Sequence, residues 1–331
     1  MFYQKLYSEE YHLTYAISGG CAILLSYDGD AAHLSLPDRL EDCLVTVIES
    51  YAFSGKGMTY LSLPAGLKKI EHHGFSECKG LTHIEFPASL EIIGNYAFYN
   101  CWEISEVHFG PYVRSIGFGA FMNCDKLTRI VQDRIEGCPL SLGSLLDELQ
   151  HQIHLEMHHM REDGSYETGM VTFTEYQTEI IADAAAIASI CKQFISEYTG
   201  SGRSLRFCLD TNGIDYRKYD GMFIKVLYMD SFDIAVRIAV ERLLYPRELG
   251  SEARTAYMDY LTEHAGEALQ KFVREDDMPA LSLLLDHALP DQAQTDAAID
   301  LAMSLDKGAV TPLLMDYRHR HFAMQEDSFD L

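Results

Sequence analysis

The stretch LTHIEFPASLEIIGNYAFYNC, residues 81–101, holds one full copy of a motif that recurs along the first part of the chain. Two residue types recur every 23 residues, namely the phenylalanines Phe75, Phe98 and Phe121 and the cysteines Cys78, Cys101 and Cys124. A fixed period of this length is typical of a solenoid, in which each turn buries its apolar side chains only against the neighbouring turns. The period therefore predicts one elongated stack in which equivalent residues of successive turns are neighbours.

Each turn contains two short strand segments and then a helical or tight-turn segment. The first strand is expected at His33–Leu36, Met58–Leu63, Leu81–Phe86, Ile104–Phe109 and Leu127–Gln132. The second strand is expected at Val45–Ile48, Leu67–Ile70, Leu90–Ile93 and Val113–Ile116. The third segment carries Phe53, Phe75, Phe98 and Phe121. Proline or Gly-Pro follows the first strand in four turns, where a missing N–H group suits a corner of the chain.

The motif Leu-x-x-Ile-x-Phe-Pro-x-x-Leu-x-x-Ile-x-x-x-Ala-Phe-x-x-Cys resembles the BspA-type leucine-rich repeat family of bacteria. Four turns within residues 30–132 carry it, and the segment from Tyr27 to Ile48 resembles the first repeat of that family. The resemblance implies a curved, right-handed solenoid that contacts proteins or glycans, often as an exported adhesin. The segment after Ser231 also resembles the helical tails that follow some of these repeats.

We therefore predict an α/β repeat solenoid of the leucine-rich repeat type, then an α+β junction, then an all-α helical-repeat domain. The solenoid, residues 1–139, includes an N-terminal strand cap made by a hairpin of residues 11–17 and 21–27. The junction covers residues 140–230. The helical domain covers residues 231–331, where the segments 276–286 and 306–316 align with an offset of 30 and suggest ankyrin-like stacking.

Within the junction, residues 152–158 and 170–174 are expected to form a hairpin around the turn Glu162-Asp-Gly-Ser. The apolar spacing of residues 180–194 predicts a helix that Thr178 caps. Residues 205–209 read as a short apolar strand, and residues 210–213 as a turn. After residue 231, helices are expected at 232–244, 251–261, 265–274, 278–287, 295–305 and 309–317.

The composition is that of a globular protein, with 331 residues and a formal net charge of −24. The acidic excess argues against nucleic acid, because binding there depends on basic residues that meet phosphates. The first residues contain no secretory signal, and no run of residues is apolar enough to span a membrane, so we expect a cytoplasmic location. In a reducing compartment the repeated cysteines would be buried thiols rather than disulfides.

The period also predicts which side chains share the exposed face of the first-strand sheet. Positions three and five of the motif face solvent, and stacking brings equivalent positions to roughly 4.8 Å. This face supplies the candidate binding residues, which are His33, Tyr60, Ser62, His83, Glu85, Glu106, His108 and Arg129. We expect His83 to lie beside Glu106, and Glu85 beside His108. Such pairs can simply avoid repulsion between like charges, form a polar recognition patch, or, with two histidines, hold a metal.

Four further histidines lie close together, namely His151, His154, His158 and His159. On a helix, His154 and His158 would be an i, i+4 pair that could share a cation. On a strand, the interpretation favoured here, they point to one side with Glu156 between them and form a solvated surface cluster. We assign no metal ligands.

Sequence motifs for a phosphate-binding loop, a nucleophile elbow or a zinc protease are missing from the chain. The predicted function is therefore a non-enzymatic protein-interaction module or scaffold without a cofactor. Its partner, a protein or, in an adhesin-like role, a host protein or glycan, would bind the exposed solenoid sheet. The acidic helical domain is an alternative interaction site. A further alternative is an enzyme or metal-binding protein with its site in residues 140–230.

Overall fold

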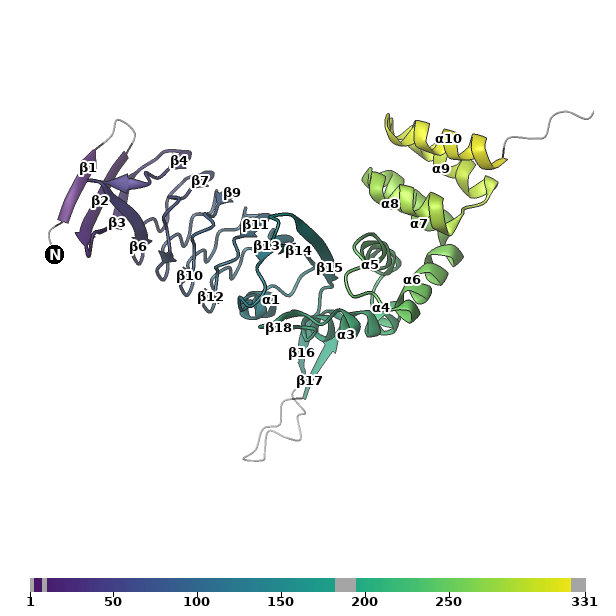
Figure 1. The fold of residues 1–331 in the computed structure, drawn as a ribbon, viewed down its shortest axis with the longest axis horizontal. Helices are drawn as coiled ribbons and strands as arrows, with labels where there is room; N and C mark the ends of the chain where they lie inside the picture. Colours follow the sequence, from purple (N-terminus) through teal and green to yellow (C-terminus); the bar gives the residue numbers. More distant parts are fainter. Residues whose placement is uncertain (1–2, 8–10, 182–194, 323–331) are drawn as a thin grey trace, which may run out of the picture. The chain divides into compact units, whose positions relative to one another are not determined.

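The computed structural model describes residues 3–7, 11–181 and 195–322, which fall into two compact units, Met1–Met222 and Phe223–Leu331 (Figure 1). The predicted boundary at residue 139 falls inside the first unit. The physical reason is that β13 (Arg129–Arg134), from the last repeat, pairs in parallel with β14 (Ile153–Met160). Junction and solenoid therefore share one sheet.

The N-terminal cap is an antiparallel sheet of β1 (Tyr3–Tyr7), β2 (Tyr11–Ser18) and β3 (Cys21–Gly29). The predicted hairpin between β2 and β3 is confirmed, and Gly19 and Gly20 adopt the positive φ angles of 60° and 78° that its two-residue turn requires. β1 was not predicted. β3 then pairs in parallel with β6 (Cys43–Ile48), so the cap continues directly into the repeats.

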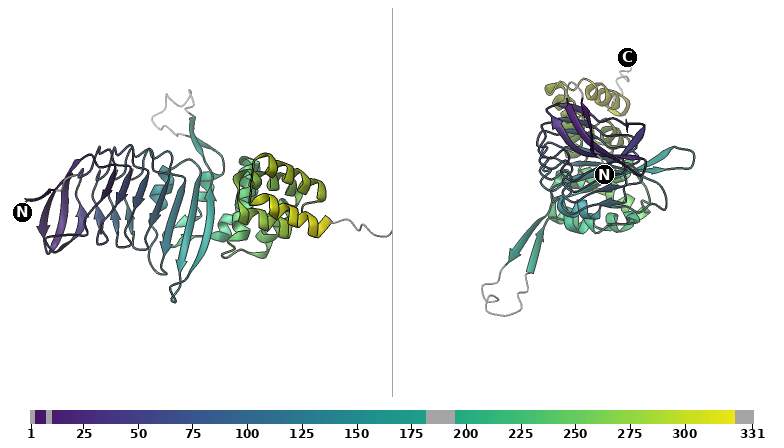
Figure 2. Two further views of the ribbon diagram at one scale, coloured as in Figure 1. Left: turned by 90° about the horizontal axis from the view of Figure 1, so that it is seen from above. Right: turned by 90° about the vertical axis from the view of Figure 1, so that its left-hand side faces the viewer.

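The solenoid turns lie side by side as predicted (Figure 2). The first strands are β4 (His33–Ser35), β7 (Tyr60–Ser62), β9 (His83–Glu85), β11 (Glu106–Phe109) and β13. The second strands are β6, β8 (Lys69–Ile70), β10 (Ile92–Ile93) and β12 (Ser115–Ile116), and the short β5 (Arg39–Leu40) pairs with β6. The second strands form one uninterrupted parallel ladder from β6 to β12.

Stacked aromatic rings form the core of the solenoid. The rings of Phe53, Phe75, Phe98 and Phe121 are fully buried and follow one another at centroid distances of 4.9, 5.4 and 5.1 Å. The segment that carries them is a tight turn, because the residue two positions before each phenylalanine has a positive φ angle of 56–67°. The thiols of Cys78, Cys101 and Cys124 are buried, and each donates to the carbonyl of a phenylalanine in the preceding turn.

The first-strand ladder, in contrast, is interrupted. β4, β7 and β9 form one parallel sheet, while β11 and β13 belong to another that continues into β14 and β15 (Tyr166–Phe173). Among the described residues, no backbone hydrogen bond joins β9 to β11. The predicted hairpin of the junction is confirmed as β14 and β15.

The short helix α1 (Gly143–Glu148) closes the end of the repeat stack. In earlier turns the carbonyl oxygens of Ile70 and Ile93 accept hydrogen bonds from backbone N–H groups of the next turn. The carbonyl oxygen of Ile116 instead accepts a hydrogen bond from the Ser144 hydroxyl group. The buried N–H group of Gly119 similarly donates to the Glu148 carboxylate instead of to a carbonyl of a further turn. Two side chains of α1 thus replace the backbone partners that a further turn would supply.

The remainder of the first unit differs from the prediction in two places. The expected helix at 180–194 begins instead as β16 (Gln177–Ile181), which pairs with β17 (Ile195–Thr199), and the residues between them lie outside the described part of the chain. The expected strand at 205–209 is not formed: Leu205 and Arg206 end helix α2 (Gly202–Arg206), residues 207 and 208 form a turn, and only Leu209 belongs to a strand. The predicted turn is confirmed between β18 (Leu209–Asp210) and β19 (Gly213–Ile214), which lead to α3 (Tyr216–Gly221).

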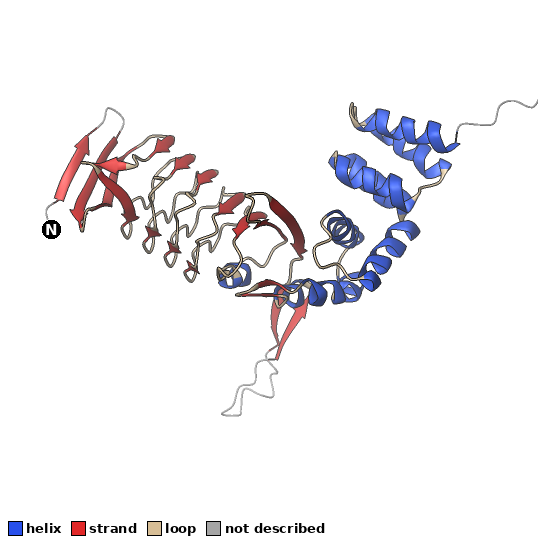
Figure 3. Cartoon of the chain, in the orientation of Figure 1, coloured by secondary structure: helices blue, strands red, loops and turns tan. Residues whose placement is uncertain are grey.

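The second unit is helical, as the sequence predicts (Figure 3). It contains α4 (Phe223–Met229), α5 (Phe232–Leu244), α6 (Ser251–Glu263), α7 (Ala265–Glu275), α8 (Met278–Leu283), α9 (Gln292–Ser304) and α10 (Val310–Phe322). A π-helical segment, Leu284–Ala288, follows α8. Asp276 and Asp306, 30 residues apart, both have positive φ angles where α7 and α9 end, which matches the predicted offset.

Candidate functional site

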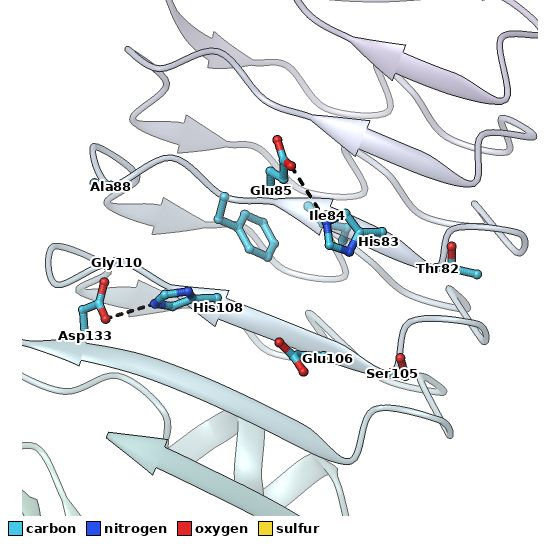
Figure 4. Close-up of a pocket in the computed structure, with 11 residues that line it drawn as sticks. Thr82, His83, Ile84, Glu85, Ala88, Ser105, Glu106, His108, Gly110 and Asp133 are labelled. Carbon is cyan, nitrogen blue, oxygen red and sulfur yellow. Dashed lines mark hydrogen bonds and ion pairs between the residues drawn. The ribbon is translucent and has the colours of Figure 1, made fainter. Parts of the chain in front are cut away.

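The break in the first-strand ladder opens a groove, which we call the β9–β11 groove (Figure 4). Its cavity volume is about 560 Å³. It is lined by Thr82, His83, Ile84, Glu85, Phe86, Ala88, Ser105, Glu106, His108, Gly110 and Asp133. Four of the eight predicted binding residues are among them. The sequence thus predicted that these residues lie on the exposed face of the first-strand sheet, but it did not predict the groove.

At one end of the groove, the two turns that form it come close together again. After β11, the backbone at Gly110 approaches the backbone that follows β9 so closely that a Cβ atom there would lie 2.9 Å from the Cα atom of Ala88. Glycine is required at this position because any side chain would overlap the neighbouring turn. The ring of Phe86 contacts Phe98 and Phe109 at centroid distances of 5.5 and 5.4 Å and supplies the apolar part of the lining.

The residues of the predicted pairs His83–Glu106 and Glu85–His108 are not partners in a strand ladder, because β9 and β11 belong to different sheets, and their closeness stays a prediction. Glu85 instead interacts within its own sheet, where the hydroxyl groups of Tyr60 and Ser62 hydrogen-bond to its carboxylate and hold its pKa below the usual value. The same bond to Glu85 raises the pKa of Tyr60. His83 Nε2 lies 3.9 Å from Glu85 Oε1. Across the groove, Glu106 pairs with Arg129.

The predicted register within each sheet is confirmed. His33, Tyr60 and His83 are direct partners on β4, β7 and β9, and Glu106 is the partner of Arg129 on β11 and β13. The rings of the first three form a column, at centroid distances of 5.7 Å from His33 to Tyr60 and 5.2 Å from Tyr60 to His83. The column was not anticipated, although the presence of a ring at position three of successive turns was the signal for it.

A second polar network crosses from the last repeat strand to β14. Arg129 makes ion pairs with Glu106 and Glu156, each with an N–O distance of 2.5 Å. Burial raises the pKa of Glu156, but hydrogen bonds from His158 and Arg129 outweigh it, and the net pKa is lowered. Because Glu156 is ionised and held on two sides, it is a fixed acceptor within this network.

His108, Asp133 and His158 meet on the adjacent strands β11, β13 and β14. Asp133 Oδ1 lies 3.0 Å from His108 Nε2 and 3.1 Å from His158 Nδ1. The Nε2 atom of the same His158 ring lies 2.7 Å from Glu156 Oε1. The sequence named both histidines but in separate groups, and it did not single out Asp133. The signal in the sequence that could have identified Asp133 is its position in the motif, which is that of Pro64 and Pro87 at the corners of earlier turns. Because no proline ends the strand there, β13 continues for six residues.

The strand interpretation of the histidine cluster is confirmed, but its members do not act together. His154 bonds to the Thr172 hydroxyl on β15, and His151 Nε2 lies 2.6 Å from the Leu127 carbonyl oxygen. His158 contacts both Asp133 and Glu156 in the network at the groove. Membrane insertion receives no support from the helices, since none in the described ranges combines the length and the apolarity that a bilayer crossing needs.

Residues 46–135 match the model of the BspA type leucine-rich repeat region, in six copies. These residues are therefore similar to BspA type leucine-rich repeats. Similar solved structures include a leucine-rich repeat protein of T. pallidum, 25% identical over 38% of this chain and 73% of that chain, with a TM-score of 0.31. A leucine-rich cell surface protein from Faecalibacterium prausnitzii is 23% identical over 45% and 40% of the two chains, with a TM-score of 0.36.

The pneumococcal vaccine antigen PcpA is also similar, with 19% identity over 40% of each chain and a TM-score of 0.32. A comparison with curated proteins finds no match. The repeat type predicted from the motif is thus confirmed for residues 46–135, whereas the ankyrin-like character of the helical unit remains a prediction.

Proposed function

We propose that the chain is a non-enzymatic protein-interaction module that binds a segment of a partner protein in the β9–β11 groove. The observation that carries the proposal is the opening of the first-strand sheet at the place where its exposed polar residues gather. Of the other first strands, β7 is hydrogen-bonded to β4 and β9, and β13 is hydrogen-bonded to β11 and β14. The groove leaves backbone groups and side chains of two strands accessible to a ligand.

The lining favours a partner segment with lysine or arginine side chains. Three carboxylates, those of Glu85, Glu106 and Asp133, face the groove. The basic residue Arg129 contacts one of them, Glu106, by an ion pair. The formal charge of the chain, −24, would also speed the approach of a basic partner. Phe86 offers a contact for one apolar side chain of the segment.

A glycan is a weaker candidate for the same face. Sugars bind proteins by placing their apolar ring face on an exposed aromatic ring. In the column of His33, Tyr60 and His83, the face of Tyr60 already stacks on His83 with an interplanar angle of 14°. The helical unit, which the sequence offered as an alternative interaction site, would act by a separate surface, and substitutions in the groove would leave its binding unchanged.

The test is binding of the full chain to arrays of peptides that differ in charge, with Glu106→Gln as the groove variant. The matched control is Glu91→Gln, because Glu91 also pairs with an arginine one turn away, Arg114, but directly precedes β10 of the other sheet. We expect basic peptides to be retained by the wild type and by Glu91→Gln, and to bind about 5-fold or more weakly to Glu106→Gln. Equal binding by both variants, or retention of glycans in place of basic peptides, would contradict the proposal.

A further inference from the structure

The three side chains that meet at the end of the groove have the types and spacing of metal ligands. His108, Asp133 and His158 each offer one ligand atom, and these atoms lie within 4.8 Å of one another. Two ligands of one tetrahedral zinc ion, with bonds of about 2.0–2.2 Å, are separated by roughly 3.3 Å. The separations of Asp133 Oδ1 from the two histidine nitrogens, 3.0 and 3.1 Å, are close to that edge.

The hydrogen bonding of His158 leaves a place for a proton or a metal ion between its Nδ1 atom and Asp133. A carboxylate only accepts hydrogen bonds, so Nε2 of His158 must carry a hydrogen for its 2.7 Å bond to Glu156. In the neutral ring, Nδ1 then presents a lone pair, and this lone pair points at a carboxylate oxygen of Asp133. Two lone pairs face each other unless a proton or a metal ion lies between them.

Glu156 has the place of an orienting residue for such a site. In many zinc proteins a carboxylate accepts the second N–H of a ligating histidine, which fixes the tautomer and turns the other nitrogen to the metal. Glu156 does this for His158, and it is itself fixed by the ion pair with Arg129. The side chains of His158 and Glu156 are only 15% and 17% exposed, so the orientation is well defined.

We infer that His108, Asp133 and His158 bind a divalent transition metal ion, zinc by preference, with Glu156 as a positioning residue. Two imidazoles and one carboxylate suit zinc, whereas calcium and magnesium prefer oxygen ligands alone. His108 and Asp133 also line the β9–β11 groove, so the remaining coordination position faces that groove. A carboxylate or carbonyl group of a molecule in the groove could fill it. The inference does not depend on the proposed partner binding.

The test is titration of the full chain, without an affinity tag and after treatment with a chelator, with Zn²⁺ by calorimetry and with Co²⁺ by visible absorption. We expect one ion per chain and cobalt bands typical of four-coordinate sites. His108→Gln is the decisive variant, because this side chain is 51% exposed and its replacement leaves the fold intact. His83→Gln is the matched control, since His83 lines the same groove from β9 outside the cluster.

The expected result is loss of the bound ion in His108→Gln, unchanged affinity in His83→Gln, and 10–100-fold weaker binding in Glu156→Gln. Calcium and magnesium in large excess should not displace the ion. The inference is overturned if His108→Gln binds zinc as tightly as the wild type, if both histidine variants lose affinity equally, or if less than one ion binds per chain.

Discussion

Replacement of Phe98 by alanine tests whether the stacked phenylalanines hold the repeats together. Phe98 is fully buried, with ring centroids 5.4 Å from Phe75, 5.1 Å from Phe121 and 5.5 Å from Phe86. Truncation of a phenylalanine in such surroundings costs about 3–5 kcal/mol, because transfer free energy is lost and a cavity remains. The upper half of that range applies here, since aromatic pairs add about 0.5–1.5 kcal/mol each beyond the buried area.

The chain contains a natural reporter for this measurement. Trp102 is its single tryptophan, lies next to the buried Cys101 and is 43% exposed, with Lys79 Nζ 4.7 Å from the ring centroid. Tryptophan fluorescence during urea unfolding therefore follows the repeats. With a slope of about 2 kcal/mol per molar urea, the midpoint of Phe98→Ala should fall by about 2–2.5 M.

The control variant is Phe118→Ala, in the same segment of the next turn. Phe118 is 59% exposed, so its truncation should change the stability by no more than about 0.5 kcal/mol. If the two variants shift the fluorescence midpoint equally, the stack of rings does not stabilise the solenoid and the cavity reasoning is refuted. A normal midpoint for Phe98→Ala would have the same consequence.

Two further predictions concern the solenoid backbone. Burial raises the pKa of Glu148, so the stability that its protonation contributes is fully present below the unfolded pKa and is lost as the pH rises through the folded pKa. The side chain of Glu148→Gln does not titrate, so this variant should lose stability relative to the wild type as the pH falls from 7 to 4. A difference in urea midpoint that stays constant over this pH range would contradict the prediction. A Cβ at Gly94 would lie 2.7 Å from backbone atoms of Glu71 and His72, so Gly94→Ala should lose about 1–3 kcal/mol in urea unfolding. The matched change Gly57→Ala, where nothing lies within 4 Å, should be near neutral, and equal losses would refute the steric argument.

The period of the sequence predicted the repeats well because it reports a direct physical relation. Phe75, Phe98 and Phe121 can recur every 23 residues and all be buried only if successive turns place them in one column, and the ring distances confirm that they do. The same relation gave the register of Tyr60 with His83 and of Glu106 with Arg129.

Periodicity did not predict where the first-strand ladder breaks. It assigns His83 and Glu106 to equivalent positions, but it contains no information on whether their strands are hydrogen-bonded. The local difference is that two large rings, Phe86 and Phe109, follow each other at position six, where earlier turns have leucine. The two rings make a tilted contact with a centroid distance of 5.4 Å.

Outside the repeats, the errors arise from short apolar segments. Residues 205–209 were assigned to a strand because five residues cannot show a helical period. In the structure, Leu205 and Arg206 are buried on helix α2, and the Arg206 guanidinium donates to the carbonyls of Leu146, Leu149 and His151 as well as Thr174. Contacts with residues about 60 positions earlier thus decide the conformation, and no local pattern reports them.

Under the proposed function, the two sheets of the solenoid have different roles, one in stability and the other in recognition. The second-strand ladder continues without a break from Ile48 through Ile70 and Ile93 to Ile116, beside the column of buried phenylalanines. These contacts keep the turns stacked where the first-strand ladder opens. The opening removes only a few backbone hydrogen bonds, each worth about 0.5–1.5 kcal/mol net, and water in the groove can satisfy the groups that are exposed. Substitutions of the exposed polar residues of the groove, such as His83 and Glu106, should therefore alter binding while leaving the unfolding midpoint almost unchanged, and substitutions of the buried column should do the reverse.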